Sequence, residues 1–154
     1  MEKELGAWNN GAGIDLASWI SCWGTYQLAI GYTSVFWPKF KLLEGYIVPE
    51  CTSEESIRGF EETAPSNRRD VEWVLNHVHL VDIHYHDVST GATEERFVWL
   101  GNTLREIYSA KLAWQFPDRP CEVEFLIPED PSNLTAYQIT FWQKAHAVTN
   151  PVSS

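Results

Sequence analysis

Residues 14–37, IDLASWISCWGTYQLAIGYTSVFW, decide the predicted fold. Asp15 is the only charged side chain in this stretch, which also holds three of the eight tryptophans of the chain. A buried backbone must satisfy its own hydrogen bonds, and tryptophan rings are large apolar surfaces that other elements cover. The stretch therefore predicts helices that form the core, with the rest of the chain built around them.

Two helices are expected within this stretch. Asp15 is a suitable N-cap for the first helix, and Gly24 is placed to end it. The second is expected from about Thr25 to Pro38, which stops it. The apolar side chains that recur at helical spacing in the first helix are Leu16, Trp19, Ile20 and Trp23.

A run of this length also raises the question of a membrane span, which needs about 20 predominantly apolar residues. Ser, Thr, Gly and Gln dilute the run and no Lys or Arg cluster flanks it, so a span is disfavoured. The preceding residues contain Glu2, Lys3 and Glu4, which do not form the basic start of a secretory signal. We expect a cytoplasmic protein that binds no membrane.

The length of 154 residues predicts one globular domain over 1–154, with an irregular lead-in over 1–13 and a frayed tail over 150–154. The composition is globular, with 44% hydrophobic and 14% aromatic residues. Three cysteines without CxxC spacing suggest neither a disulfide framework nor a zinc ribbon, and they favour a reducing compartment.

The remaining pattern predicts an α+β fold. Helices are expected at about 52–64, from Ser66 to about residue 78, and over 93–115, where the helical periodicity is longest. About four antiparallel strands, arranged as two hairpins, are expected to pack as a single layer pair against about four to five helices. The expected strands are residues 39–43, 46–49, 121–127 and 137–142, with Glu44-Gly45 as the first turn.

The net charge of −10 comes from 21 acidic and 11 basic residues. It argues against nucleic acid and anionic membranes as partners, since both require Lys and Arg patches. A basic protein is the macromolecular partner that this charge suits, although many proteins are acidic simply to remain soluble. Residues 50–62 contain five glutamates and a single basic residue, Arg58. We call these glutamates the acidic segment: Glu50, Glu54, Glu55, Glu61 and Glu62.

Residues 76–87, NHVHLVDIHYHD, hold four of the five histidines. If residues 81–86 form a strand, Asp82, His84 and His86 project from one face at steps of about 6.6 Å and could ligate a divalent transition metal. His77 and His79 fit less well, because positions i and i+2 of a helix point about 200° apart. The alternative is that these side chains form the solvated face of a half-buried strand.

No GxSxG, P-loop, GxGxxG or HExxH motif is present, and no cofactor is expected. Tryptophan and tyrosine dominate interface hot spots, although at least five of the eight tryptophans, Trp19 and Trp23 among them, are expected in the core. Small acidic immunity proteins and inhibitors of basic toxins are similar in size and composition. We favour a non-enzymatic protein-binding module whose acidic segment meets a basic protein. The alternative is a metal-dependent enzyme with a His/Asp site around residues 77–87.

Overall fold

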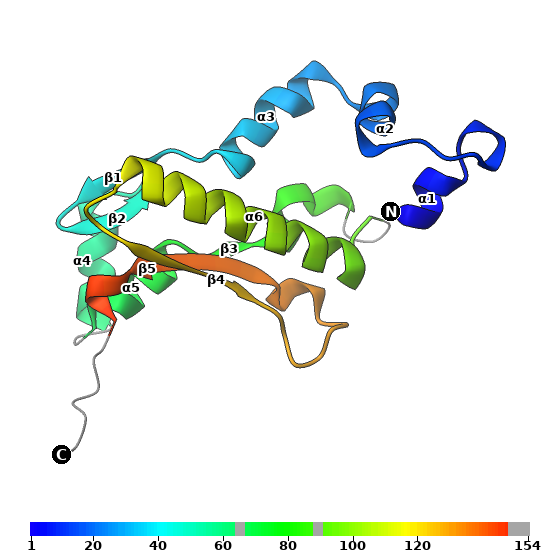
Figure 1. The fold of residues 1–154 in the computed structure, drawn as a ribbon. Coiled ribbons are helices and arrows are strands. Elements are labelled where there is room, and N and C mark those ends of the chain that lie inside the picture. The colour runs from blue at the N-terminus through cyan, green and yellow to red at the C-terminus, as the bar shows by residue number, and fades with distance from the viewer. Residues whose placement is uncertain (64–66, 88–90, 148–154) are drawn as a thin grey trace, which may run out of the picture. The chain divides into compact units, whose positions relative to one another are not determined.

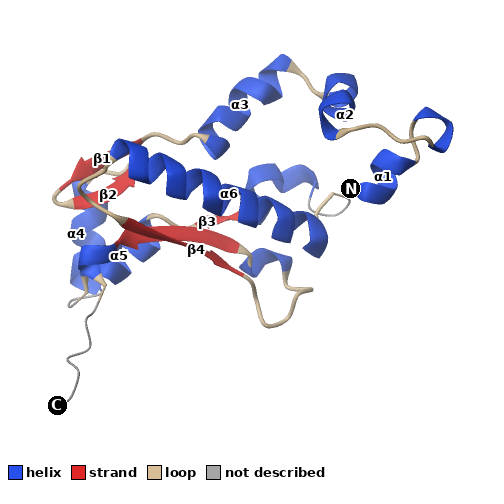
Figure 2. Cartoon of the chain, viewed as in Figure 1, coloured by secondary structure: helices blue, strands red, loops and turns tan. Residues whose placement is uncertain are grey.

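The computed structural model describes residues 1–63, 67–87 and 91–147, and the side chains of residues 85–87 lie outside the description. The chain has an α+β fold (Figures 1 and 2). Its contacts divide it into two compact units, Met1–Val35 and Phe36–Ser154, where the sequence predicts one domain. We call these the N-terminal unit and the C-terminal unit.

The N-terminal unit is helical. It contains α1 (Glu2–Gly6), the short 3₁₀ helix η1 (Asn9–Gly11), α2 (Leu16–Trp23) and α3 (Tyr26–Phe36), whose last residue belongs to the C-terminal unit. Both helices expected in residues 14–37 are confirmed, and the lead-in is more regular than expected. Asp15 caps α2 by accepting a hydrogen bond of 2.6 Å from the Ser18 amide, which lowers the pKa of the Asp15 carboxyl. The Trp8 ring meets the Trp23 ring edge to face at 6.2 Å.

The expectation that residues 14–37 form the core is wrong. Neither α2 nor α3 contains a buried residue, and Trp23 is 65% exposed. The buried apolar residues of the described chain begin at Phe40. Helical spacing shows that one face of a helix is apolar, but it does not show what covers that face. No helix in the described ranges has both the length and the apolarity needed to cross a bilayer.

The tryptophans are also placed differently from expectation. Trp142 is the only one of the eight that is buried, whereas Trp23, Trp37, Trp99 and Trp114 are exposed. The prediction that at least five are core residues is therefore wrong. Their large rings made burial the default expectation, but most of them lie at helix ends or on the outer faces of helices.

The first hairpin of the C-terminal unit is confirmed. It pairs β1 (Phe40–Leu43) with β2 (Tyr46–Pro49) in antiparallel register, with Phe40 opposite Pro49. Both turn residues have positive φ, 52° at Glu44 and 83° at Gly45, as a type I′ turn requires. Gly45 adopts this conformation without strain, whereas Glu44 carries the steric cost that its own Cβ atom imposes at positive φ.

The second sheet contains β3 (Val78–His79), β4 (Cys121–Leu126) and β5 (Gln138–Gln143) in the order β3-β5-β4. All pairs are antiparallel, and Cys121 lies opposite Gln143. The hairpin of β4 and β5, connected through η3 (Leu134–Ala136), was predicted and is confirmed. The described chain thus has five strands in two sheets, where four strands in a single layer pair were expected. The last five residues of β5 are buried, so elements cover both of its faces.

Three longer helices complete this unit: α4 (Glu54–Thr63), α5 (Arg68–Leu75) and α6 (Glu94–Gln115). Ser53 caps α4 by accepting from the Ser56 amide at 3.1 Å. Asn67 caps α5, and the predicted cap at Ser66 lies outside the described residues. The last described element is η4 (Lys144–His146).

The strand predicted over residues 81–86 is wrong. Residues 80–87 form the 3₁₀ helix η2 (Leu80–Asp87), which is interrupted at His84 by φ of −139° and ψ of 72°. The chain leaves the sheet at Leu80, whose amide donates to the Tyr137 carbonyl and whose side chain is buried. Alternation of apolar and polar residues suggested a strand, but the anchoring of Leu80 in the core ends β3 after two residues.

Helix α6 packs on the sheet of β4 and β5, and Figure 1 shows it running alongside these strands. Gly101 stands at the contact. A Cβ atom at this position would lie 2.2 Å from two ring atoms of Phe125, which is closer than any real contact. The absence of a side chain at residue 101 therefore sets how closely the helix approaches β4. The side chains that α6 buries on either side of Gly101 are Phe97, Leu104, Tyr108 and Leu112.

Replacing Gly101 by alanine should destabilise the protein. Overpacking of a core costs about 1–3 kcal/mol, which exceeds the roughly 0.5–1 kcal/mol that alanine gains over glycine in a helix. Gly59→Ala in α4 is the matched control, because no atom lies within 4 Å of a Cβ built there. Urea unfolding followed by circular dichroism should show a lower free energy of unfolding for Gly101→Ala and a higher one for Gly59→Ala. Equal stabilisation by both changes would contradict the packing described here.

Candidate functional site

The acidic segment is presented to solvent. Ile57 is the only buried residue of α4, and all five glutamates of the segment are exposed. Ile57 packs in a core cluster with Tyr46 and Val48 of β2 and Val71 of α5. Helix α4 is therefore attached to the C-terminal unit by one apolar face, and the opposite face carries the negative charge.

Three of these glutamates have partners within the unit. Glu50 pairs with Lys39 at 3.7 Å, Glu54 with Arg58 at 3.3 Å, and Glu61 accepts a hydrogen bond of 2.6 Å from the Tyr46 hydroxyl. Glu55 and Glu62 make no ion pair or hydrogen bond within the described residues. They stand two turns apart on one side of α4, so their carboxylates are the ones available to an external cation.

The Tyr46–Glu61 contact is structural. Tyr46 is buried, and its burial together with the hydrogen bond to Glu61 raises the pKa of the phenol to about 12, against the opposing charge of Arg68. The guanidinium of Arg68 lies 4.0 Å above the Tyr46 ring. The hydroxyl thus stays protonated at neutral pH and donates to Glu61, which fixes α4 against β2.

An exposed aromatic pair lies where α6 ends near β1. The Trp37 and Trp114 rings are 6.1 Å apart, and the two residues are 49% and 71% exposed. The ammonium of Lys111 lies 4.6 Å from the Trp37 ring and 5.4 Å from the Trp114 ring. These cation–π contacts hold two large rings at the surface instead of in the core.

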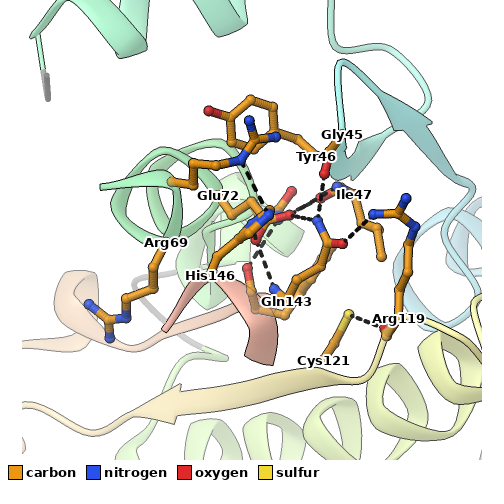
Figure 3. A network of polar contacts seen from close by, with 12 residues as sticks. Gly45, Tyr46, Ile47, Arg69, Glu72, Arg119, Cys121, Gln143 and His146 are labelled. Carbon is orange, nitrogen blue, oxygen red and sulfur yellow. Dashed lines mark hydrogen bonds and ion pairs between the residues drawn. The ribbon is translucent and has the colours of Figure 1, made fainter. Parts of the chain in front are cut away.

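The polar centre of the unit is the carboxylate of Glu72 on α5, which is 0% exposed (Figure 3). Its Oε1 atom accepts from the Ile47 amide at 3.0 Å and from Gln143 Nε2 at 2.6 Å. Its Oε2 atom accepts from the Gln143 amide at 2.8 Å and from His146 Nδ1 at 2.9 Å. Four donors fill the acceptor sites of one carboxylate.

Asn76, one turn after Glu72, adds to these contacts, and we call the bonds of Glu72 and Asn76 together the Glu72 bridge. Its Nδ2 atom donates to the Ile47 carbonyl at 2.9 Å and to the Phe141 carbonyl at 3.0 Å. Gln143 Nε2 adds a bond of 2.9 Å to the Gly45 carbonyl. Side chains therefore join the edge of β2 to the edge of β5, where β3 no longer covers it, and link the two sheets without a backbone ladder.

The tautomer of His146 follows from its partners. Arg68 Nε can only donate, and it lies 3.3 Å from His146 Nε2, so this nitrogen carries a lone pair and Nδ1 carries the proton that Glu72 accepts. Both ring nitrogens are thus engaged, which leaves no base or ligand for a substrate. Burial raises the pKa of the nearby Cys121 thiol to about 12, so this cysteine remains protonated and unreactive.

The predicted metal ligands are not placed on one strand face. Asp82 and His84 are exposed on η2, and the side chain of His86 lies outside the described residues. With the strand lost, the geometric argument that brought the three together is lost as well, and the metal set stays a prediction. Among the side chains that the structure describes, no group of three His, Cys, Asp or Glu residues is arranged to hold a metal ion.

The structure instead brings His77 and His79 together. Their ring centres are 5.2 Å apart with planes at 85°, and the Trp73 ring stacks on His77 at 6.3 Å. The expectation that these histidines diverge assumed a helix, but α5 ends at Leu75 and His79 lies in β3. In extended chain, positions i and i+2 share a face.

Comparison of the chain with protein-family models, with curated proteins and with solved structures finds no match. The functional argument therefore rests on the chemistry of the residues themselves.

The Glu72 bridge should be a large contributor to stability. In Glu72→Gln an amide NH₂ replaces one oxygen and faces two N–H donors, which should lower the free energy of unfolding by about 2–4 kcal/mol. Glu122→Gln is the matched control, because its exposed pair with Lys144 should contribute less than about 1 kcal/mol. Chemical denaturation of both variants measures the difference. Equal stabilities would show that the bridge is not a major support of the fold.

Proposed function

We propose that the chain is a protein-binding module, of the immunity or inhibitor kind, that recognises a basic protein surface. The observation that carries this proposal is the outward face of α4, where Glu55 and Glu62 are exposed and have no partner among the described residues. Helix α4 itself is fixed by Ile57 and by the Tyr46–Glu61 bond. A charged face on a fixed support is pre-organised for association, because little ordering is needed when a partner binds.

The exposed pair of Trp37 and Trp114 supplies the apolar part of such a surface. Tryptophans dominate interface hot spots, and charged residues usually surround them. Gln115 Nε2 donates to the Phe40 carbonyl at 2.6 Å, which holds the end of α6 at β1. The Glu50 amide bonds the Lys39 carbonyl at 2.9 Å, two residues from Trp37. The aromatic pair and the start of the acidic segment thus belong to the same end of the C-terminal unit.

The alternative of a metal-dependent enzyme using Asp82, His84 and His86 has less support. Its ligands were to converge on a strand that the chain does not form. The buried carboxylate of Glu72 and the partly buried His146 are already bonded to one another and to other groups. A binding role requires no such constellation.

The charge-reversal variant Glu55→Lys/Glu62→Lys tests the proposal. Glu61 is left unchanged, because its replacement would leave the Tyr46 hydroxyl without its hydrogen-bond acceptor. The control is Glu94→Lys/Glu129→Lys, which makes the same change of net charge at exposed sites, one of them also in a helix first turn. Immobilised wild type, variant and control would each be used to capture partners, and the dissociation constant of any captured protein would then be measured with purified components.

We expect a basic protein to bind the wild type and the control equally and the variant at least about a hundredfold more weakly, because reversal replaces two attractions by two repulsions. Trp114→Ala should weaken the same binding, as loss of a hot spot does, by about 2 kcal/mol. Retained binding by the charge-reversal variant would refute the role of α4. Both the charge-reversal variant and Trp114→Ala must melt at the wild-type temperature, so that weaker binding cannot be due to unfolding.

A further inference from the structure

We propose that His77 and His79 form a binding site for a divalent transition metal ion, of the class of Zn²⁺, Ni²⁺ or Cu²⁺, with their Nε2 atoms as ligands. This site is separate from the partner-binding surface and does not depend on it. It differs also from the predicted set of Asp82, His84 and His86, because it uses the two histidines that the sequence argument had set aside.

The backbone places both histidines on one face of the second sheet. Val78 pairs with Ile139 and His79 with Gln138, so the chain is extended at β3. Val78 therefore points to one side, and His77 and His79 point to the other. The contact between their rings, 5.2 Å between centres, confirms this arrangement.

The hydrogen bonds of the two rings select the tautomer that a metal requires. His79 Nδ1 lies 2.8 Å from the Thr135 carbonyl, and His77 Nδ1 contacts the Val74 carbonyl. Carbonyl oxygens only accept, so each Nδ1 carries the proton and each Nε2 carries a lone pair in the neutral ring. Within the described residues neither Nε2 atom has a hydrogen-bond partner. Metal-binding histidines commonly use this same orientation, with the second nitrogen bonded to a backbone carbonyl.

The separation of the rings also fits a shared ion. A metal–nitrogen bond of about 2.1 Å and a tetrahedral angle place two imidazole centres roughly 5 Å apart. The observed separation is 5.2 Å, and perpendicular ring planes such as the observed 85° are compatible with binding one ion. Both side chains are half-buried, so an ion and its remaining water ligands can reach them from solvent.

Neighbouring contacts hold the pair in place. Trp73 stacks on His77 at 6.3 Å with planes at 22°, and the Trp73 carbonyl accepts a bond of 2.8 Å from Thr140 Oγ1 on β5. His79 is fixed by its strand pairing and by the Thr135 carbonyl. A site whose ligands are already ordered loses little entropy on binding, so two histidines should suffice for measurable affinity.

Isothermal titration calorimetry of the dialysed full chain with ZnCl₂, NiCl₂ and CuCl₂ tests the proposal. We expect one ion per chain, with Cu²⁺ bound more tightly than Ni²⁺ or Zn²⁺. His77→Ala and His79→Ala should each weaken binding by at least about tenfold, as loss of ligand support does. The matched control, His84→Ala, should bind as the wild type does.

Nitrogen-15 spectra of the histidine rings give a second readout that does not require a variant to fold. Before metal is added, His77 and His79 should show protonated Nδ1, and Zn²⁺ should shift their Nε2 signals selectively. Absence of binding to the wild type would overturn the proposal. So would binding that is lost in His84→Ala and retained in His77→Ala, since that pattern assigns the metal to the residues of η2.

Discussion

The carboxylate of Glu72 is the group on which the C-terminal unit depends. Two sheets meet beside α5, and strand β3 covers only the first part of the β5 edge. A buried backbone group left without a partner costs about 1–3 kcal/mol, so the buried edges of β2 and β5 that no strand pairs need donors and acceptors. Glu72 and Asn76 supply them from one helix, and their i, i+4 spacing lets both reach the same seam.

The proposed partner-binding surface on α4 takes its position from this bridge. Residues of β2 alternate in role: the backbone of Ile47 bonds to Glu72 and Asn76, whereas the side chains of Tyr46 and Val48 pack with Ile57 and Val71. Tyr46 then bonds to Glu61. The acidic face of α4 is thus connected to the buried carboxylate through a single strand, and a change at the bridge would move the surface as well as lower stability.

Local patterns predicted much of the fold, but not what covers each element. Helical spacing located α2, α3 and α6, and Glu44-Gly45 located the first hairpin, because these signals lie within a few residues of the chain. The prediction that residues 14–37 are buried was wrong, because an apolar helix face does not identify the element that covers it. The bonds of Glu72 to Gln143 and His146 join residues 71 and 74 positions apart. No local pattern marks such a contact, and Glu72 reads in sequence as an ordinary exposed glutamate.

The same segment shows why the histidines were misjudged. Between Glu72 and His79 the chain passes from α5 to β3, and the period of its side chains changes from 3.6 residues to two. Glu72 and Asn76 follow the helical period and turn inward to the seam. His77 and His79 follow the extended period and meet on the face of the sheet. The predicted helix ran to about residue 78, whereas α5 ends at Leu75, and the helical period applied to these extra residues separates two rings that are in contact. Because the period changes within residues 72–79, Glu72 and Asn76 bond to the edges of the two sheets. His77 and His79 lie on the sheet face, where solvent reaches them.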